Sequence, residues 1–478
     1  MSDGLVRLLD GNTFVVSDET GDIDAAPAIP TGLFSFDTRF LSKWILSING
    51  ERVNPLSVEE VAYFESRFFV VPTVPSPLVD ISVSAIRERT VGASFTERLT
   101  VINHEPEPAD LRIRIDIESD FADLFEIKDV SNKRGTYYTQ IEDGCLRLGY
   151  QRETFRRETL ISSSAPAQVD ERGMTYDLRL EPHGRWVTDV HVSTLGVDGR
   201  DLRETLQGRP GRTKIQMQED LDRWLAEAPR LTSASPKLAM TYRRSLVDLA
   251  ALRFMPVTGR GHALPAAGLP WFMAIFGRDS ILTSLQALPF APDLAATTLR
   301  LLALTQGVIL DDFREEEPGK ILHELRYGET TGFEEQPHSP YYGSADSTAL
   351  YVILLDEYER WSGDATAVRL LERAARAALD WIDEYGDIMG DGYVWYQRRN
   401  EKNGLENQCW KDSWDGISFR DGRLPSLPRA TCEIQGYAYD AKIRGARLAR
   451  EFWNDPAYAD RLEREAAELK ERFNRDFW

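Results

Sequence analysis

The stretch Thr348-Ala349-Leu350-Tyr351-Val352-Ile353-Leu354-Leu355 decides the fold of the C-terminal half of this 478-residue chain. Its side chains are apolar nearly all round a helical turn, which is typical of a helix buried on every side. We expect this helix to run from Asp346 to Trp361.

The helices that follow residues 348–355 have a single apolar stripe each and charged residues opposite, so they are expected to be outer helices. The stripes are formed by Leu371, Ala375, Ala378 and Ile382, and by Leu462, Ala466, Leu469 and Phe473. Helices are predicted at 236–254, 280–288, 294–305, 346–361, 365–385, 433–453 and 456–473. A buried helix followed by an amphipathic one, repeated, indicates an α/α toroid with an inner and an outer ring.

Before about residue 230 the chain has the pattern of β-strands. Residues 111–117 alternate apolar and polar side chains, the period of a sheet with one wet face. Residues 44–48 run into Asn49-Gly50, the dipeptide that best tolerates positive φ in a hairpin turn. Further strands are expected at 81–86, 95–101, 175–180 and 186–193. We therefore predict an antiparallel β-sandwich over residues 1–215, a helical linker over 216–235 and a helical domain over 236–478.

Composition limits the classes of partner. The net charge of -20 argues against a broad basic face for nucleic acid or an anionic membrane, and suits a neutral ligand. Three separated cysteines, Cys145, Cys409 and Cys432, form neither a disulfide framework nor a metal motif. The start of the chain lacks a signal-peptide pattern, and no apolar run reaches the ~20 residues of a membrane-spanning helix. The sequence thus predicts a cytoplasmic protein without a cofactor.

The residues expected to have a catalytic or binding role lie mostly in three long loops. Residues 257–277, 310–342 and 387–429 are rich in Gly, Pro, Trp, Tyr and acidic residues, and each precedes a buried helix. In a toroid they would gather at one mouth of the barrel. Within the last loop, Cys409-Trp410-Lys411-Asp412-Ser413-Trp414-Asp415-Gly416 places two carboxylates among two indoles. Aromatic faces that stack on pyranose rings, beside a carboxyl group that can donate a proton, are typical of sites for uncharged sugars.

Several motifs, in this order along the chain, resemble those of bacterial and archaeal glycogen debranching enzymes (amylo-α-1,6-glucosidases). An N-terminal segment resembles the signature of their sandwich, and four later segments resemble motifs of their catalytic barrel. The segments are Gly32-Leu33-Phe34-Ser35-Phe36-Asp37-Thr38-Arg39-Phe40, Phe276-Gly277-Arg278-Asp279-Ser280 preceded by Ala267 to Phe272, Tyr341 to Thr348, Trp410-Lys411-Asp412-Ser413 and Glu433-Ile434-Gln435-Gly436-Tyr437. The resemblance spans nearly the whole chain and implies a six-hairpin (α/α) toroid.

The resemblance implies inverting hydrolysis of a glucosidic bond by two opposed carboxyl groups, roughly 6.5–9.5 Å apart. Carried over by motif, Asp412 is the catalytic acid. Arg278 and Asp279 are expected to hold sugar hydroxyls. The other residues expected in the same substrate-binding pocket are Trp271, His323, Glu324, Tyr342, Asp346, Trp410 and Lys411.

Each of these residues also has a structural interpretation. Asp279 precedes a predicted helix and could be its N-cap, with Arg278 a surface partner. Asp412 beside Lys411 could be a solvated loop pair, and Asp415-Gly416 is a turn pair. Glu433 could cap a buried helix, and Asp37 and Arg39 could brace a turn of the sandwich. His323-Glu324 lacks the second histidine of a zinc helix, so no metal site is expected.

One departure from the family is that only about seven helices follow residue 230, whereas six hairpins need twelve. The family's catalytic base, a glutamate, lies in a later part, and no residue of this chain matches its motif. We therefore expect a truncated chain that holds half a toroid, self-association through its open edge, and little or no glucosidase activity from this chain alone. The alternatives are another toroid sugar enzyme (a glucosylglycerate or mannosylglycerate hydrolase, or a phosphorylase) and a non-catalytic carbohydrate-binding protein.

Overall fold

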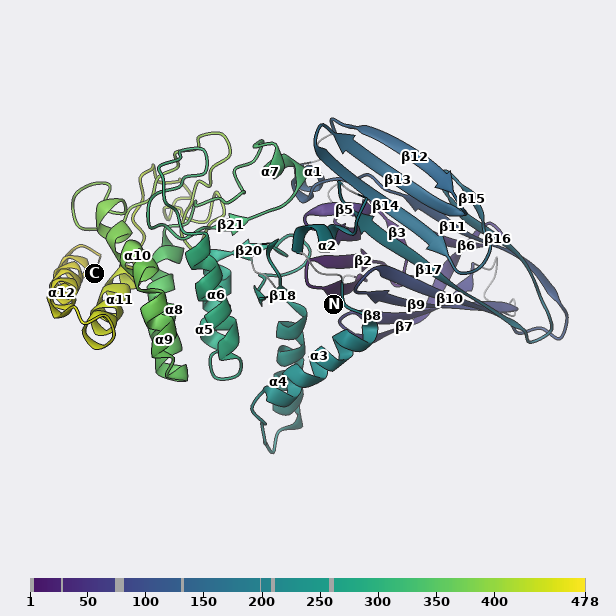
Figure 1. Cartoon of the computed structure of the whole chain (residues 1–478), viewed down its shortest axis with the longest axis horizontal. Helices are drawn as coiled ribbons and strands as arrows, with labels where there is room; N and C mark the ends of the chain where they lie inside the picture. Colours follow the sequence, from purple (N-terminus) through teal and green to yellow (C-terminus); the bar gives the residue numbers. More distant parts are fainter. Residues whose placement is uncertain are drawn as a thin grey trace. The chain divides into compact units, whose positions relative to one another are not determined.

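A computed structural model describes residues 4–26, 29–73, 81–129, 133–197, 199–207, 211–257 and 262–477 of the chain. They fall into two compact units (Figure 1). Unit 1 comprises Met1–Leu252 with the short segment Gly328–Thr330, and unit 2 comprises Arg253–Tyr327 with Thr331–Trp478. Most strands lie in unit 1 and most of the longer helices in unit 2. The units divide after Leu252, so the helix that follows Ser235 belongs to unit 1.

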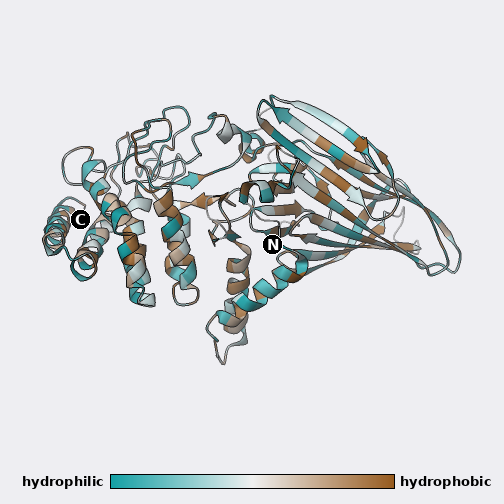
Figure 2. Cartoon of the chain, in the orientation of Figure 1, coloured by the Kyte–Doolittle hydropathy of each residue, from teal (hydrophilic) through white to brown (hydrophobic). Residues whose placement is uncertain are grey.

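The largest element of unit 1 is an antiparallel sheet of 13 strands among the described residues. In spatial order its strands are β12 (Thr136–Glu142), β13 (Cys145–Arg152), β14 (Phe155–Ser163), β17 (Arg185–Leu195), β10 (Phe95–Asn103), β9 (Val83–Val91), β8 (Glu65–Pro72), β7 (Glu51–Ala62), β6 (Lys43–Ile48), β11 (Ala109–Glu118), β16 (Gly173–Leu180) and β15 (Gln168–Asp170), with β3 (Ile23–Asp24) paired to β6. Figure 2 shows hydrophobic and hydrophilic residues alternating along these strands.

The sheet folds over on itself between β6 and β7. These two strands pair only beside their turn, at Ser47↔Arg52 and Ile48↔Glu51. Across the fold, the Trp44 ring of β6 meets the Phe95 ring of β10 edge to face, with centroids 5.4 Å apart. The inner faces of the two leaves therefore form one core, and the predicted large β-sandwich is confirmed.

The turn of the predicted β6–β7 hairpin is confirmed in detail. Asn49 and Gly50 have φ of 55° and 88°, as a type I′ turn requires. Strand β11 pairs with β6 on its other side, and its buried and less buried residues alternate as the sequence predicts.

The described part of unit 1 also contains a second, four-stranded sheet and several helices. The sheet has the order β1 (Val6–Asp10), β2 (Thr13–Ser17), β4 (Gly32–Ser35) and β5 (Thr38–Leu41). The helices are α1 (Leu124–Asp129), α2 (Leu202–Gln207), α3 (Lys214–Glu227) and α4 (Pro236–Ala251). Arg39 pairs with Asp120, and its Nε donates to both oxygens of that carboxylate, at 3.0 and 3.1 Å.

Unit 2 consists of helical hairpins joined by long loops. Its helices are α5 (Gly277–Ala287), α6 (Pro292–Leu304), α8 (Asp346–Ser362), α9 (Ala365–Leu370), α10 (Glu372–Glu384), α11 (Cys432–Glu451) and α12 (Pro456–Asp476). The short helix α7 (Glu329–Gly332) begins in the segment assigned to unit 1. Two small ribbons pair β18 (Arg253–Phe254) with β19 (Leu264–Pro265), and β20 (Ile275–Phe276) with β21 (Glu324–Leu325).

The layering of unit 2 follows its hydrophobic pattern. Helix α8 packs against α5 on one side and α11 on the other, while α6, α10 and α12 pack against these three from behind. Residues 348–355 are all buried, and so are the stripe residues Ala375 and Ala378 of α10. The buried and the amphipathic helices are thus layered as expected, whereas the incomplete toroid stays a prediction.

Two details of the predicted helices are wrong. Residues 365–385 form two helices, α9 and α10, which meet at Leu371 (φ -97°, ψ 5°). Helix α5 begins at Gly277, so Asp279 lies in its first turn and is not its N-cap. Within the described part of the chain, no helix combines the length and apolar character needed to cross a membrane.

Candidate active site

The N-terminal ends of the three inner helices carry the acidic residues of the site. Helices α5, α8 and α11 each have a carboxylate in the first turn, namely Asp279, Asp346 and Glu433. The unpaired N–H groups of a helix N-terminus stabilise such negative charges. Because α8 packs against both other helices, these ends share one side of unit 2, where the long loops also lie (Figure 1).

Arg278 connects this end of the helices to the loop that bears Asp412. Its Nη1 donates to Asp346 Oδ2 (3.0 Å) and to the carbonyl of Cys409 (2.8 Å), and its Nη2 donates to Asp412 Oδ2 (2.5 Å). Burial alone would lower the pKa of the guanidinium, but the two carboxylates outweigh burial and raise the pKa above its ordinary value. Arg278 is therefore a fixed positive charge, and the interpretation as a surface residue is wrong.

Asp346 is the inner counter-ion of Arg278. Its side chain is completely buried, and it accepts a second hydrogen bond from Ser344 Oγ, which lies 2.5 Å from Asp346 Oδ1. Ser344 Oγ also lies 2.7 Å from Ser347 Oγ. A buried carboxylate with these bonds keeps one orientation, so it holds the guanidinium in place.

Asp412 lies on the long connection between α10 and α11, and 36% of its side chain is exposed. Asn407 closes this part of the loop. Its Nδ2 donates to the carbonyl of Ser413 (2.6 Å), while its Oδ1 accepts hydrogen bonds from Tyr396 (3.1 Å) and Arg429. Asn407 is fully buried, and thus fixes the turn that presents Asp412.

A second buried carboxylate, Glu315, anchors the same loop farther back. Its side chain accepts four hydrogen bonds, from the backbone N–H groups of Arg399 (2.6 Å) and Asn400 (3.1 Å), from Tyr341 Oη (2.7 Å) and from Gln408 Nε2 (2.7 Å). Four donors satisfy a carboxylate completely, so Glu315 has a structural role. It ties the loop to the segment that precedes α8.

His323 and Glu324, both expected to bind sugar, lie beside Arg278 and differ in their state of charge. Burial lowers the pKa of His323, which favours its neutral form. Glu324 accepts hydrogen bonds from Arg326 Nε and pairs with His338 Nε2, both at 2.9 Å. Burial would raise the pKa of Glu324, but His338 and Arg326 hold it well below its usual range. Both Glu324 oxygens therefore already have partners.

The remaining expected residues are placed in different ways. The Tyr342 hydroxyl is buried and donates to the carbonyl of Thr305 (2.8 Å), a bond that ties a loop to the end of α6. The Trp271 carbonyl accepts a hydrogen bond from Arg326 Nη2 (2.7 Å). Asp279 is half-buried, and no side chain in the described ranges donates a hydrogen bond to its carboxylate.

The two residues that flank Asp412 on its N-terminal side, Trp410 and Lys411, are exposed. The indole of Trp410 is 57% exposed and that of Trp414 is 68% exposed. Flat apolar rings such as these suit the faces of sugars. Among the described residues, no group of three or more His, Cys, Asp or Glu side chains could hold a metal ion.

Sequence reasoning missed the residues that shape the loop, such as Asn407, Glu315 and Ser344. It also interpreted Glu433 as structural. The structure gives the Glu433 carboxylate a hydrogen bond from Thr431 Oγ1 (3.0 Å), and both Glu433 and Asp346 contribute, after burial, to raising the pKa of Tyr437.

Residues 8–191 match the family model described as the N-terminal domain of (some) glycogen debranching enzymes. Unit 1 is similar to that domain. The match includes both leaves of the sandwich and the residues 32–40 that carry the resemblance in sequence. No curated protein matches the chain in sequence.

Comparison with solved structures finds similar chains. A "putative kojibiose phosphorylase from human microbiome" has a TM-score of 0.54 at 9% identity, covering 97% of this chain and 66% of that one. A GH92 family glycosyl hydrolase, ccman5, has a TM-score of 0.43 at 12% identity, covering 98% of this chain and 61% of that one. The chain thus spans about two thirds of the length of the first of these. At such identities the first likeness concerns the fold alone.

Proposed function

We propose that this chain carries the catalytic acid of a sugar-processing enzyme that cleaves α-glucosidic bonds, with amylo-α-1,6-glucosidase activity in α-glucan debranching as its specific reaction. Because no residue matches the base of that family, hydrolysis by this chain alone should be slow. One observation carries the proposal: the buried Arg278 bonds at once to Asp346 and to Asp412, so a partly exposed carboxyl group is held in a fixed position. The match of residues 8–191 to the N-terminal domain of debranching enzymes supports the choice of substrate.

We propose Asp412 as the proton donor. One guanidinium faces two carboxylates, so the three groups carry one net negative charge when both carboxylates are ionised. Asp346 has no access to water and is the permanent partner of Arg278. Asp412 keeps 36% exposure and can exchange a proton with solvent or with a glycosidic oxygen. Its contact with Arg278 must weaken when the proton is taken up.

The surroundings of Asp412 suit a neutral sugar. Trp410 and Trp414 offer exposed rings on either side of it in sequence. The carboxylate of Asp279, next to Arg278, has acceptor capacity for sugar hydroxyls. We propose these residues for substrate binding, together with Trp271 and Lys411, and we assign no residue as the base that activates water.

The test compares the full chain with Asp412→Asn and, as a matched control in the same loop, Asp415→Asn. Isomaltose and maltose are supplied with and without inorganic phosphate. General acid catalysis contributes roughly 10²–10⁴-fold, so Asp412→Asn should lose turnover by that factor while Asp415→Asn keeps it. Release of glucose in the absence of phosphate supports hydrolysis. Formation of glucose 1-phosphate only when phosphate is present supports a phosphorylase instead.

A second substrate separates binding geometry from water activation. With α-glucosyl fluoride and azide, the C1–F bond breaks, fluoride leaves, and azide forms a C1–N bond from the opposite face. Formation of β-glucosyl azide would show that the pocket positions the anomeric carbon C1 of the sugar for attack with inversion, even if hydrolysis is slow. Saccharide binding with no turnover of any of these substrates would contradict the proposal and favour a non-catalytic carbohydrate-binding protein.

A further inference from the structure

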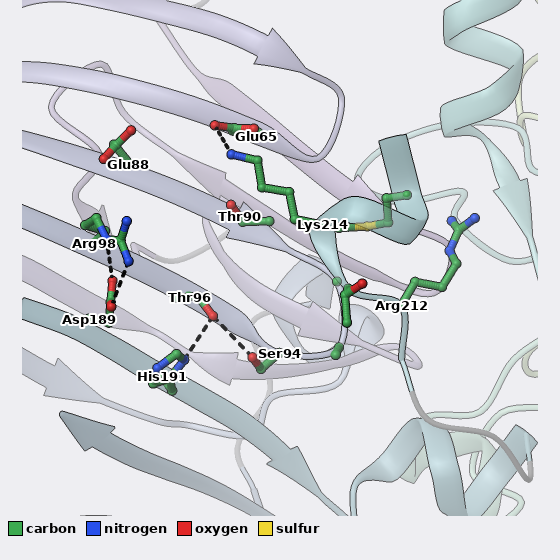
Figure 3. A pocket seen from close by; sticks show the side chains of 14 residues that line it. Glu65, Glu88, Thr90, Ser94, Thr96, Arg98, Asp189, His191, Arg212 and Lys214 are labelled. Atoms are coloured by element: carbon green, nitrogen blue, oxygen red, sulfur yellow. Dashed lines mark hydrogen bonds and ion pairs between the residues drawn. The ribbon is translucent and has the colours of Figure 1, made fainter. Parts of the chain in front are cut away.

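Unit 1 has a groove of its own on the outer face of the sandwich (Figure 3). It lies where strands β8, β9, β10 and β17 meet the start of helix α3, and its volume is about 370 Å³. Small-ligand pockets typically have about 300–1,000 Å³. All residues that line it belong to unit 1, whereas Asp412 belongs to unit 2, so the groove is a separate site.

The floor of the groove is a row of small polar side chains. Thr96 of β10 lies opposite Thr90 of β9 and opposite His191 of β17, so the three side chains share one face of the sheet. Thr96 Oγ1 is 3.1 Å from His191 Nδ1 and 3.3 Å from Ser94 Oγ (Figure 3). The floor therefore presents hydroxyl and imidazole groups and no bulky side chain.

The walls of the groove are charged, and the charges are already paired. Arg98 donates to both oxygens of Asp189, with Nε at 2.8 Å and Nη2 at 3.0 Å. Lys214 Nζ donates to Glu65 Oε1 at 2.7 Å (Figure 3). Arg212, also at the groove, donates to Asp220 at 2.6 Å and bonds to Asp10. An ionic ligand would have to displace one of these intramolecular partners.

A neutral ligand with many hydroxyl groups could bind without displacing any of these intramolecular partners. A carboxylate has about four acceptor positions and a guanidinium has five N–H donors, so a paired side chain can still bond to a hydroxyl. Such bonds to charged groups are stronger than bonds between neutral groups. We propose that this groove binds a neutral saccharide, whose hydroxyls bridge the floor at Thr96 and the ion pairs of the walls.

The groove is built to keep its shape. The N–H of Ala93, in the β9–β10 turn, donates to the carbonyl of Arg212 (2.7 Å). At Gly92 a Cβ would lie 2.6 Å from that same carbonyl oxygen and 2.7 Å from Met217, so only glycine allows the turn to approach α3 so closely. Thr213 and Gln216 form a capping box that fixes the start of α3. A preformed site avoids the cost of ordering on binding.

Hydrogen–deuterium exchange of the full chain with maltoheptaose tests the proposal. The choice of this probe rests on the proposed function, but the groove does not. We expect protection of amides in residues 94–98 and 189–191. Thr96→Val is isosteric and removes the hydroxyl, and Thr96→Arg fills the groove. Both variants should lose the protection, with at least a tenfold weaker affinity for Thr96→Arg by calorimetry.

Thr100→Val and Thr100→Arg are the matched controls, because Thr100 lies on the same face of β10 but outside the groove. They should bind as the unchanged chain does. The proposal is overturned if maltoheptaose protects no groove peptide, if the Thr96 and Thr100 variants behave alike, or if glucose 6-phosphate protects the groove and maltoheptaose does not. If maltoheptaose does not bind the groove but the chain still turns over isomaltose, saccharide binding by the groove is refuted and the proposed function is not.

Discussion

Replacing Asp346 by asparagine should destabilise unit 2 by about 3 kcal/mol. Asp346 is fully buried and is one of two carboxylates that bond to Arg278, which is itself only 8% exposed. Removing one partner of a buried ion pair costs ~3–5 kcal/mol because the other charge loses its compensation. Arg278 keeps its bonds to Asp412 and to the Cys409 carbonyl, so we expect the lower end of this range.

Differential scanning calorimetry and near-ultraviolet circular dichroism can follow this change in the full chain. For a domain of this size, 1 kcal/mol shifts Tm by roughly 2–4 °C, so the transition of unit 2 should move down by about 6–12 °C. The matched control is Asp279→Asn, whose carboxylate lies in the same region without a side-chain hydrogen bond in the described structure, and which should change stability by less than about 0.5 kcal/mol. Equal shifts in the two variants would refute the assignment of Asp346 as the inner counter-ion.

Three further changes test other contacts. Asp123 is buried, and burial raises its pKa to about 6, so near pH 5 it binds a proton in the folded chain but not in the unfolded chain. Its contribution to the free energy of unfolding should therefore rise by roughly 1 kcal/mol from pH 7 to pH 5, and chemical denaturation should show no such rise for Asp123→Asn. Asn407→Leu removes a buried donor worth ~1–3 kcal/mol and should speed amide exchange in residues 409–416, whereas unchanged exchange would show that another contact holds the loop. Gly50→Ala meets no atom within 4 Å, so its cost, measured by denaturation, should be only the ~1 kcal/mol of a left-handed residue.

Local chemistry made most of the fold predictable from the sequence. The Asn49-Gly50 turn, the alternation of β11 and the stripe of α10 depend on neighbouring residues only, and all three are observed. The rule that polar residues lie outside fails in β9. Arg87 and Arg89 point into the sandwich, fully buried, and both bond to the buried Glu97 of β10. The partner is on another strand, so no local pattern could reveal it.

The candidate site was only partly predictable for the same reason. The motifs selected Arg278, Asp346 and Asp412, but Arg278 and Asp412 are 134 residues apart in sequence, and their contact depends on how the loop folds. Glu324 was expected to bind sugar, yet Arg326 and His338 occupy its oxygens. Such partners are distinguished only by side-chain geometry, which a motif does not specify.

The charge balance around Arg278 bears on which sugar substrate the site can accept. Arg278 serves Asp346 and Asp412 together, and the carboxylate of Asp279 lies beside it in sequence. Arg326, which is also buried, is paired with Glu324. A glycerate group or inorganic phosphate would therefore bring a negative charge to carboxylates that already outnumber the available cations. An uncharged glucoside meets no such repulsion, and its hydroxyls can bond to the same carboxylates. This favours a neutral α-glucan over glucosylglycerate or mannosylglycerate, and water over phosphate as the acceptor.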